Sequence, residues 1–356
     1  IKTVEQAGVI QDVQDEASDV LTAKPFTATA VDPAFVLPDH LNVIAVGFGS
    51  EGKTLIGVST QSDVAIRTWD VAEMKLANEV KLDSDKHGNR FLQGHLTLSK
   101  NGTRVVCFLD GNVTIWDAAT GKLLRTLEVP DDLKHGFLRG LSCTPDLSLI
   151  ACGRNPGVGG FSPPDAHAVV WNANTGEVVQ TAKHENAVQV QSLALSADGK
   201  WMATGGQQEG TRVWDVSTGK LLLDLPNANL DRSHPDPDVQ EPAASQVLCL
   251  AFSPDGKQLA IGDMFGVKLV EATTGKRLHR FDAPFRYGRS GFVFSGDGQW
   301  LARVATDKVV PIWSTQTGQL VTVLPTEAHV GTFSDDGKLF AVGLSDGKKG
   351  IAVWPL

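Results

Sequence analysis

Three short stretches of the sequence place an arginine beside an aromatic side chain. They read NRFLQGH (89–95), HGFLRG (135–140) and FRYGRSG (285–291). An arginine supplies planar hydrogen bonding and an aromatic ring supplies rigid apolar area, a combination that binding hot spots favour. The candidate partner-binding residues are therefore Arg90, Phe91, Phe137, Arg139, Arg286, Tyr287 and Arg289. In the structural alternative, Phe91, Phe137 and Phe285 pack the loops onto the body and the arginines pair with acidic neighbours.

Patterns that would indicate catalysis or metal binding are missing from the sequence. Nucleophilic catalysis needs a base beside the nucleophile and a third group that orients the base. The one Gly-x-Ser-x-Gly stretch, residues 343–347, lies in the turn before an expected third strand rather than between a strand and a helix, and the 9 histidines are scattered mostly through expected loops. No His-x-His or His-x-x-x-His pair has the spacing of metal ligands. We therefore expect no catalytic residues, no cofactor and no metal site.

The remaining unusual segments also have plain structural interpretations. The cysteines show no Cys-x-x-Cys spacing, so we expect buried free thiols in first or second strands at Cys107, Cys143, Cys152 and Cys249. Residues 153–167 are glycine-rich but lack the spacing of a phosphate-binding loop. Residues 226–245 are rich in proline and acid, which predicts a solvated, semi-rigid loop. A lid, or an arm that reaches a neighbouring module, is the alternative.

The elements that must position these residues come from a repeat. In LSADGKWMATGGQQEGTRVWDVSTGKLLLDL (195–225), an Asp-Gly turn, a second turn and a Ser-Thr-Gly turn separate four short apolar runs. Asp-Gly between alternating apolar runs is a strong hairpin signal. The same order recurs along the chain. Its third strand ends at Trp69, Trp116, Trp171, Trp214, Val270, Trp313 and Trp354.

The last copy lacks its fourth strand, and the N-terminal part of the sequence contains a segment that could supply it. The chain stops two residues after Trp354, so the seventh copy has no fourth strand. Residues of about 25–37, PFTATAVDPAFVL, precede the first copy and have no other partner. We expect this segment to supply the missing outer strand, because closing a ring in this way removes an open sheet edge.

On these seven ordered copies the chain resembles the WD-repeat β-propeller family over roughly residues 25–356. The resemblance implies an all-β, seven-bladed propeller of four-stranded antiparallel blades, with each third-strand tryptophan between neighbouring blades. It also implies hydrogen-bonded structural networks of Asp, His and Trp, although copies three to five depart from the pattern. The matching positions are Trp69, Trp116, Trp171, Trp214, Trp313, Trp354, Asp110, Asp263, Asp307, Asp346 and His95. The sequence style is similar to that of bacterial members, which are often modules of larger proteins.

Function is expected where the connections are long. All the long connections fall on one face of the expected ring, at 83–95, 130–139, 153–167, 226–246 and 282–290. Loops tolerate insertion and often carry binding residues. The resemblance implies a non-catalytic platform for a protein or peptide partner. Two alternatives stay open: a propeller hydrolase or lyase, or a metal site, at the channel mouth, and a purely structural spacer.

Composition limits the classes of binding partner but does not indicate a cellular compartment. The formal net charge of −9 disfavours general nucleic-acid or anionic-membrane binding, and no run of about twenty apolar residues predicts a membrane span. Residues 1–24 are expected to be a linker, with a short surface helix as the alternative, and nothing resembles a signal peptide. We expect a monomer or a module fused to another, in the cytoplasm, or in the periplasm or at the cell surface if an upstream part carries a signal or anchor.

Overall fold

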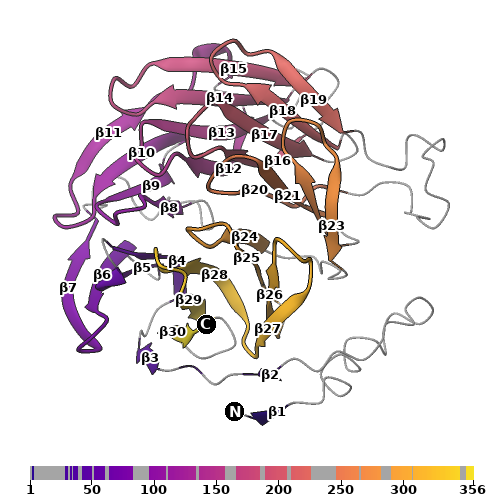
Figure 1. Cartoon of the computed structure of the whole chain (residues 1–356). Coiled ribbons are helices and arrows are strands. Elements are labelled where there is room, and N and C mark those ends of the chain that lie inside the picture. The colour runs from indigo at the N-terminus through magenta and orange to yellow at the C-terminus, as the bar shows by residue number, and fades with distance from the viewer. Residues whose placement is uncertain are drawn as a thin grey trace.

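Tight turns divide the chain into short antiparallel strands that form seven sheets around one axis, as the computed structural model shows (Figure 1). The turns end the strands because their glycines adopt a positive φ, for example 71° at Gly199 and 70° at Gly219, which side chains disfavour. The structure describes residues 2–3, 29–30, 33, 35–38, 42–49, 52–60, 64–82, 96–109, 111–133, 136–156, 166–184, 189–206, 210–225, 246–263, 266–281, 290–306, 308–344 and 350–356.

Each sheet contains one four-stranded blade, and in blades 1 to 6 the four strands run outward from the axis in chain order. Blade 1 comprises β4 (Asn42–Phe48), β5 (Thr54–Thr60), β6 (Val64–Asp70) and β7 (Lys75–Lys81). Blade 2 comprises β8 (Leu96–Leu98), β9 (Arg104–Leu109), β10 (Asn112–Asp117) and β11 (Leu123–Leu127). Blade 3 follows a short 3-10 helix, η2 (Asp131–Leu133), and comprises β12 (Gly136–Cys143), β13 (Leu149–Pro156), β14 (Ala166–Asn172) and β15 (Val178–His184).

The second half of the ring repeats this arrangement. Blade 4 comprises β16 (Val190–Leu195), β17 (Trp201–Gly206), β18 (Thr211–Asp215) and β19 (Leu221–Leu225). Blade 5 comprises β20 (Cys249–Phe252), β21 (Gln258–Asp263), β22 (Gly266–Glu271) and β23 (Arg277–Phe281). Blade 6 comprises β24 (Ser290–Phe294), β25 (Trp300–Ala305), β26 (Val310–Ser314) and β27 (Leu320–Leu324). Blade 7 comprises β28 (Ala328–Phe333), β29 (Leu339–Leu344), β30 (Gly350–Pro355) and β3 (Phe35–Pro38).

An N-terminal strand closes the ring. β3 pairs antiparallel with β30, with Phe35 opposite Val353 and Pro38 opposite Gly350. Leu37 is buried against Ile351 in the core between blades 7 and 1. The predicted fold, a seven-bladed ring whose last blade is completed from the N-terminal side, is therefore confirmed. Further out, β1 (Lys2–Thr3) pairs with β2 (Thr29–Ala30), and β2 lies parallel to β27 at the outer edge of blade 6.

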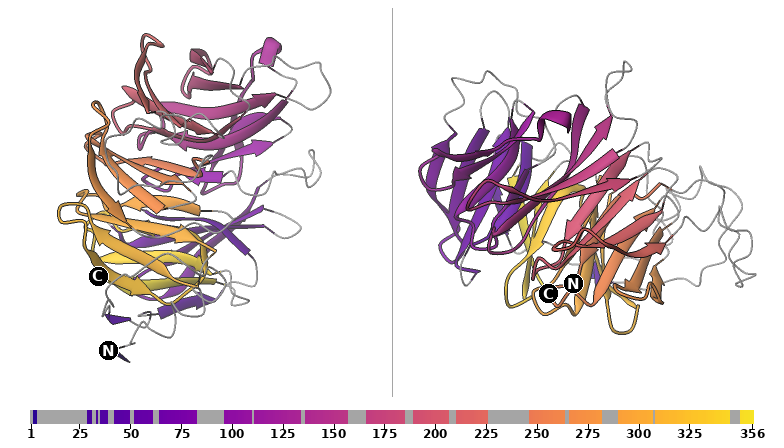
Figure 2. Two further views of the ribbon diagram at one scale, coloured as in Figure 1. Left: turned by 90° about the vertical axis from the view of Figure 1, so that its right-hand side faces the viewer. Right: turned by 90° about the horizontal axis from the view of Figure 1, so that it is seen from above.

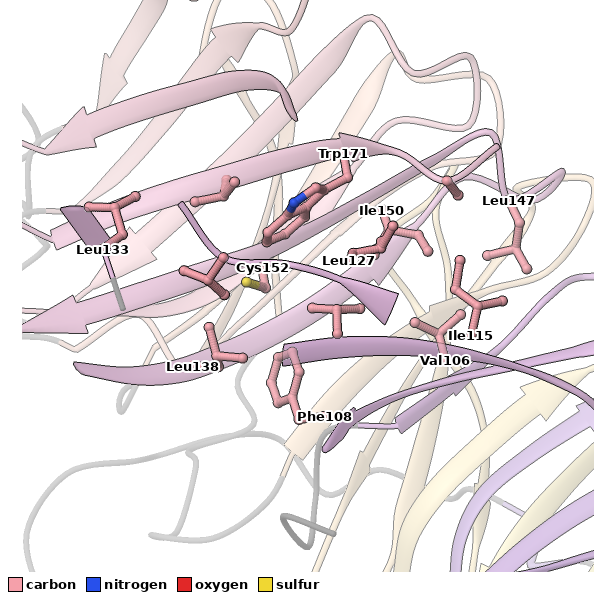
Figure 3. Packing of buried hydrophobic residues seen from close by; sticks show 14 residues of the cluster. Val106, Phe108, Ile115, Leu127, Leu133, Leu138, Leu147, Ile150, Cys152 and Trp171 are labelled. Carbon is pink, nitrogen blue, oxygen red and sulfur yellow. The ribbon is translucent and has the colours of Figure 1, made fainter. Parts of the chain in front are cut away.

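The apolar core lies between blades, which explains the sequence pattern of the middle strands. Both faces of a blade pack against neighbours, so β9 is buried continuously from Val105 to Leu109, whereas most of β11 is exposed. Figure 3 shows the core between blades 2 and 3, where Phe108 and Leu127 of blade 2 face Ile150 and Trp171 of blade 3. In the side views of Figure 2, the strands run across the thickness of the ring and connect its two faces.

Candidate functional site

The two faces of the ring carry different kinds of connection. Because the strands of a blade alternate in direction, the first-to-second and third-to-fourth connections share one face, here called the turn face. The second-to-third connections and those between blades share the opposite face, here called the loop face. The predicted long connections belong to the loop face, and most of their length lies outside the described residues: 83–95, 134–135, 157–165, 226–245 and 282–289.

Among the predicted partner-binding residues, Arg139 is the one whose side chain the structure describes. It lies in β12, the innermost strand of blade 3, and its side chain is exposed while that of Leu138 is buried. The Arg139 side chain makes no hydrogen bond or ion pair within the part of the chain that the structure describes, whereas its backbone pairs with Gly153 of β13. Five of the other candidates lie outside the described residues, and Phe137 is described only as part of the β12 backbone: Arg90, Phe91, Arg286, Tyr287 and Arg289.

A β-bulge follows Arg139 directly. Gly140 is the extra residue between Arg139 and Leu141 and has φ 57°. A β-carbon at Gly140 would lie 2.9 Å from Leu193 Cδ2 of the next blade, so a side chain there would require Leu193 to shift as well as straining the backbone. Bulges bend a strand and change the direction of its side chains. Three other innermost strands carry a bulge as well, with the extra residues Ile44, Gln191 and His329.

The turn face is built from one repeated hydrogen-bond motif. A serine or threonine hydroxyl donates to the side-chain oxygen two residues later and accepts the backbone N–H five residues later, as Ser196 does with Asp198 (2.8 Å) and Trp201 (2.9 Å). The motif recurs at Ser99, Thr144, Ser196, Ser253, Ser295 and Ser334. The backbone N–H of Ser148 and the Thr144 hydroxyl lower the pKa of Asp146 below its ordinary value. These carboxylates are therefore turn-stabilising groups rather than free acids.

A cavity of about 530 Å³ occupies the axis of the ring. The innermost strands line it, with polar atoms from Thr97, Thr332 and His329 among apolar neighbours. Lys100 and Asp335 lie in its wall and form an ion pair of 3.4 Å between Nζ and Oδ1. Among the described residues, no three His, Cys, Asp or Glu side chains come together as a metal site would require, and no helix is long and apolar enough to cross a membrane.

Comparisons with known proteins agree with this geometry. The family described as "WD domain, G-beta repeat" matches residues 176–215 and 239–264. The chain is 22% identical to nuclear distribution protein nudF of Aspergillus niger, over 81% of this chain and 62% of that protein. This chain contains WD repeats and folds as a seven-bladed β-propeller. It is also 25% identical to small ribosomal subunit protein RACK1 of Drosophila melanogaster, over 49% of this chain and 46% of that protein.

A third relative is a subunit of target of rapamycin complex, LST8-1 of Arabidopsis thaliana, which is 29% identical over 30% of this chain and 31% of that protein. The propeller thus spans less than two thirds of the length of each relative named here.

The repeat tryptophans of this WD-repeat propeller are all buried, and each packs against the preceding blade. Trp171 shows this directly, because its indole Nε1 donates to Glu128 O at 3.0 Å, from blade 3 to the end of blade 2. Trp116 and Trp214 instead donate to Thr114 and Thr204 hydroxyls of their own blades, each at 2.8 Å. The buried positions are Trp69, Trp116, Trp171, Trp214, Trp313 and Trp354.

The acidic and histidine positions expected from the family are described only in part. Asp263 is buried at the end of β21, and its Oδ2 lies 3.2 Å from Lys268 Nζ. The remaining positions lie outside the described residues: His95, Asp110, Asp307 and Asp346. His184, at the end of β15, is buried beside Trp214 with ring centroids 5.2 Å apart.

Two arginines that precede repeat tryptophans by two residues were not predicted from the sequence. Arg67 Nε and Nη2 donate to both carboxylate oxygens of Glu79 on β7, at 3.1 and 3.3 Å. Arg212 Nη1 lies 3.2 Å from His184 Nδ1, and its Nε donates to Asp224 on β19 at 3.4 Å. Because an arginine only donates, His184 Nδ1 is the acceptor. The shared spacing from the tryptophan was a usable signal for both arginines.

Proposed function

We propose that this WD-repeat propeller is a non-catalytic platform that binds a protein or peptide partner on its loop face. The observation that carries the proposal is the difference between the faces. Turn-face connections are short and repeat one hydrogen-bond motif, as at Ser196 and Ser334, so they vary little from blade to blade. Loop-face connections differ in length and composition, and variable loops on a rigid scaffold are where binding residues concentrate.

Arg139 supports this placement from within the described structure. It is held by an innermost strand rather than by a loop tip, and its guanidinium is exposed without a partner among the described residues. The strand fixes the backbone of Arg139, and its planar guanidinium suits recognition of carbonyl or carboxylate groups. Arg286, Tyr287 and Arg289 are proposed to extend the same contact region from the connection between blades 5 and 6.

The relatives support the same class of function. RACK1 is by its name a ribosomal subunit protein, and LST8-1 is by its name a subunit of a complex. Membership of an assembly requires surfaces that bind other macromolecules. We propose that the present chain also acts as an assembly component, without catalytic residues of its own.

The test is a comparison of two charge-reversal variants in capture from native lysate of the source cells. One variant changes Arg139, Arg286 and Arg289 to Glu on the loop face. Its matched control changes Lys200, Lys257 and Lys338 to Glu, three exposed lysines of the turn face. Both variants must keep the parent's thermal unfolding midpoint.

A protein captured by the parent and by the turn-face control, but lost with the loop-face variant, is the expected result. The captured protein is then purified and its Kd is measured for the same three chains, with an increase of about tenfold or more expected for the loop-face variant. Equal capture by all three chains, or no specific capture by the parent, would contradict the proposal.

A further inference from the structure

A cleft of about 370 Å³ opens on the turn face between blades 2 and 3. Its lining comes from the first turn of each blade, the strand β11 and the third turn of blade 3. The polar side chains at the cleft include Arg104, Arg125, Asn101, Asn174 and Asp146, and the exposed apolar side chain is Leu124, with 48% of its surface accessible. Beneath them lies the core of Figure 3, where Ile115 and Leu147 lie side by side at one end of the cluster.

Arg125 is held in this cleft by the neighbouring blade. Its Nη1 donates to Thr175 O at 3.0 Å, and a β-carbon at Gly176 would lie 3.1 Å from the same Nη1. His279 makes the equivalent contact in blade 5, where its Nε2 lies 3.1 Å from Gln316 O of blade 6. A side chain that bridges one blade to the next turn is therefore a recurrent structural device. In Arg125, however, the bridge leaves Nε and Nη2 without a partner among the described residues.

Arg104 distinguishes this cleft from the corresponding turns of the other blades. It is the residue whose backbone N–H bonds the turn serine, Ser99, at 3.0 Å. The residues bonded in the same way in the other blades are uncharged: Leu149, Trp201, Gln258, Trp300 and Leu339. Arg104 Nη1 donates to Asp117 Oδ2 at 2.8 Å and to Thr103 O at 3.1 Å. Its Nε and Nη2 make no further bond within the described part of the chain.

The acids beside these arginines are already satisfied by their own turns. Asp117 Oδ1 accepts the backbone N–H of Ala119 at 3.1 Å and both the N–H and the hydroxyl of Thr120, each at 2.9 Å. Asp146 Oδ1 accepts the Thr144 hydroxyl at 2.7 Å and the backbone N–H of Ser148 at 2.9 Å. The cleft therefore holds two guanidinium groups, each with some N–H donors unused among the described residues, beside the carboxylates of Asp117 and Asp146.

We propose that this cleft is a second binding site, which takes a peptide with an acidic residue next to an aliphatic one. Arginine binds a carboxylate with two parallel hydrogen bonds, and the two guanidinium groups are held in place before binding. The exposed side chain of Leu124 offers apolar contact to the neighbouring aliphatic residue, which a small free anion would leave unused. The site lies on the face opposite Arg139, so this proposal does not depend on the loop-face proposal.

The probe is a fluorescein-labelled, amidated peptide, Gly-Ser-Gly-Glu-Leu-Gly-Glu-Leu-Gly-Ser-Gly, and its control has Gln in place of both Glu residues. Fluorescence anisotropy gives the Kd of each peptide at low salt, where charge pairing is least screened. The variants are Arg125→Ala and Arg104→Leu, which introduces the residue that blades 3 and 7 carry at this position. His279→Ala is the matched control for loss of the inter-blade contact, and Arg139→Glu is the control for the loop face.

We expect the Glu peptide to bind the parent, His279→Ala and Arg139→Glu alike, and to bind Arg125→Ala and Arg104→Leu about tenfold more weakly or worse. The Gln peptide should bind the parent as weakly as the Glu peptide binds the arginine variants. Arg125→Ala keeps the Arg104–Asp117 ion pair, so it tests the site even if Arg104→Leu unfolds. No binding of the Glu peptide to the parent, equal binding of both peptides, or full binding by Arg125→Ala would overturn the proposal.

Discussion

Lys100 Nζ lies 3.4 Å from Asp335 Oδ1, and this ion pair joins blade 2 to blade 7 across the end of blade 1. The turn residues of non-adjacent blades therefore meet where the axial cavity reaches the turn face. Both side chains are half exposed, at 58% and 48%. Solvent screens such a pair, and exposed ion pairs contribute little to stability.

Lys100→Ala should accordingly lower the free energy of unfolding by less than about 1 kcal/mol. The difference from the parent should shrink as salt rises toward 1 M, because the pair is screened. Denaturant unfolding of parent and variant at low and high salt measures both quantities. A loss of several kcal/mol, or a loss independent of salt, would mean that the pair is structurally essential.

Two turns in the described part of the chain carry a non-glycine residue at positive φ, and substitution by glycine should change stability in opposite directions at the two positions. Met74 has φ 52° where the equivalent turns of other blades have glycine, and its side chain is 54% exposed. Positive φ costs a side-chain-bearing residue about 1–2 kcal/mol, which Gly avoids at a backbone-entropy cost of about 0.5–1 kcal/mol. Met74→Gly should therefore raise stability by up to about 1 kcal/mol, measured by denaturant unfolding.

Leu147 is the matched case, because it has φ 56° but is only 7% exposed in the core between blades 2 and 3. Leu147→Gly relieves the same backbone strain but leaves a cavity in the apolar core. Removal of a buried leucine side chain lowers the free energy of unfolding by about 2–5 kcal/mol. The net effect should be destabilising, opposite in sign to that of Met74→Gly. If both variants shift stability in the same direction, the difference between the two positions is not set by backbone strain and side-chain burial.

These turns also show why the sequence predicts the fold better than the site. The order of turn, strand and tryptophan seen from Gly199 to Trp214 recurs along the chain. The number of strands, the order of the blades and the closure by β3 therefore follow from periodicity and turn chemistry. Loop-face residues such as Arg286 belong to no repeat, so nothing in their spacing says what they contact. Arg125 reaches Thr175, 50 residues away, through the packing of two blades, and a single sequence does not encode that contact as a pattern.

Acid should destabilise the propeller through its turn-face carboxylates. The Ser334 hydroxyl and the Lys338 N–H lower the pKa of Asp336, and the Thr120 hydroxyl lowers that of Asp117. A lowered pKa in the folded state adds stability that is fully present above the ordinary value of about 3.9 and is lost as pH falls from that value through the lower pKa of the folded state. The thermal midpoint should therefore hold steady near neutrality and fall below about pH 4.

Blade 2 supplies the control for this pH dependence. Asn101 takes the aspartate position there, and its Oδ1 accepts the Ser99 hydroxyl at 2.8 Å and the Thr103 N–H at 3.1 Å, as the carboxylates do. Asp336→Asn should thus change neutral-pH stability little and flatten the acid dependence, while Asn101→Asp should steepen it. Identical acid profiles for both variants would assign acid unfolding to other groups.

The cysteines should differ in reactivity according to their burial. Desolvation raises the pKa of Cys107 to about 11, although the Thr114 hydroxyl, 3.3 Å from its Sγ, lowers it in part. Desolvation raises the pKa of Cys152 further still. Since the thiolate is the reactive form, both thiols should resist a disulfide reagent at pH 8 in the folded state. Cys143 also has its pKa raised to about 11, but it is half-buried and lines the axial cavity, so it should react first.

Mass spectrometry of timed labelling measures the order in which the thiols react. A denatured sample, in which all four thiols react, is the control. Labelling of Cys152 before Cys143 would show that the core between blades 2 and 3 opens more readily than the cavity wall.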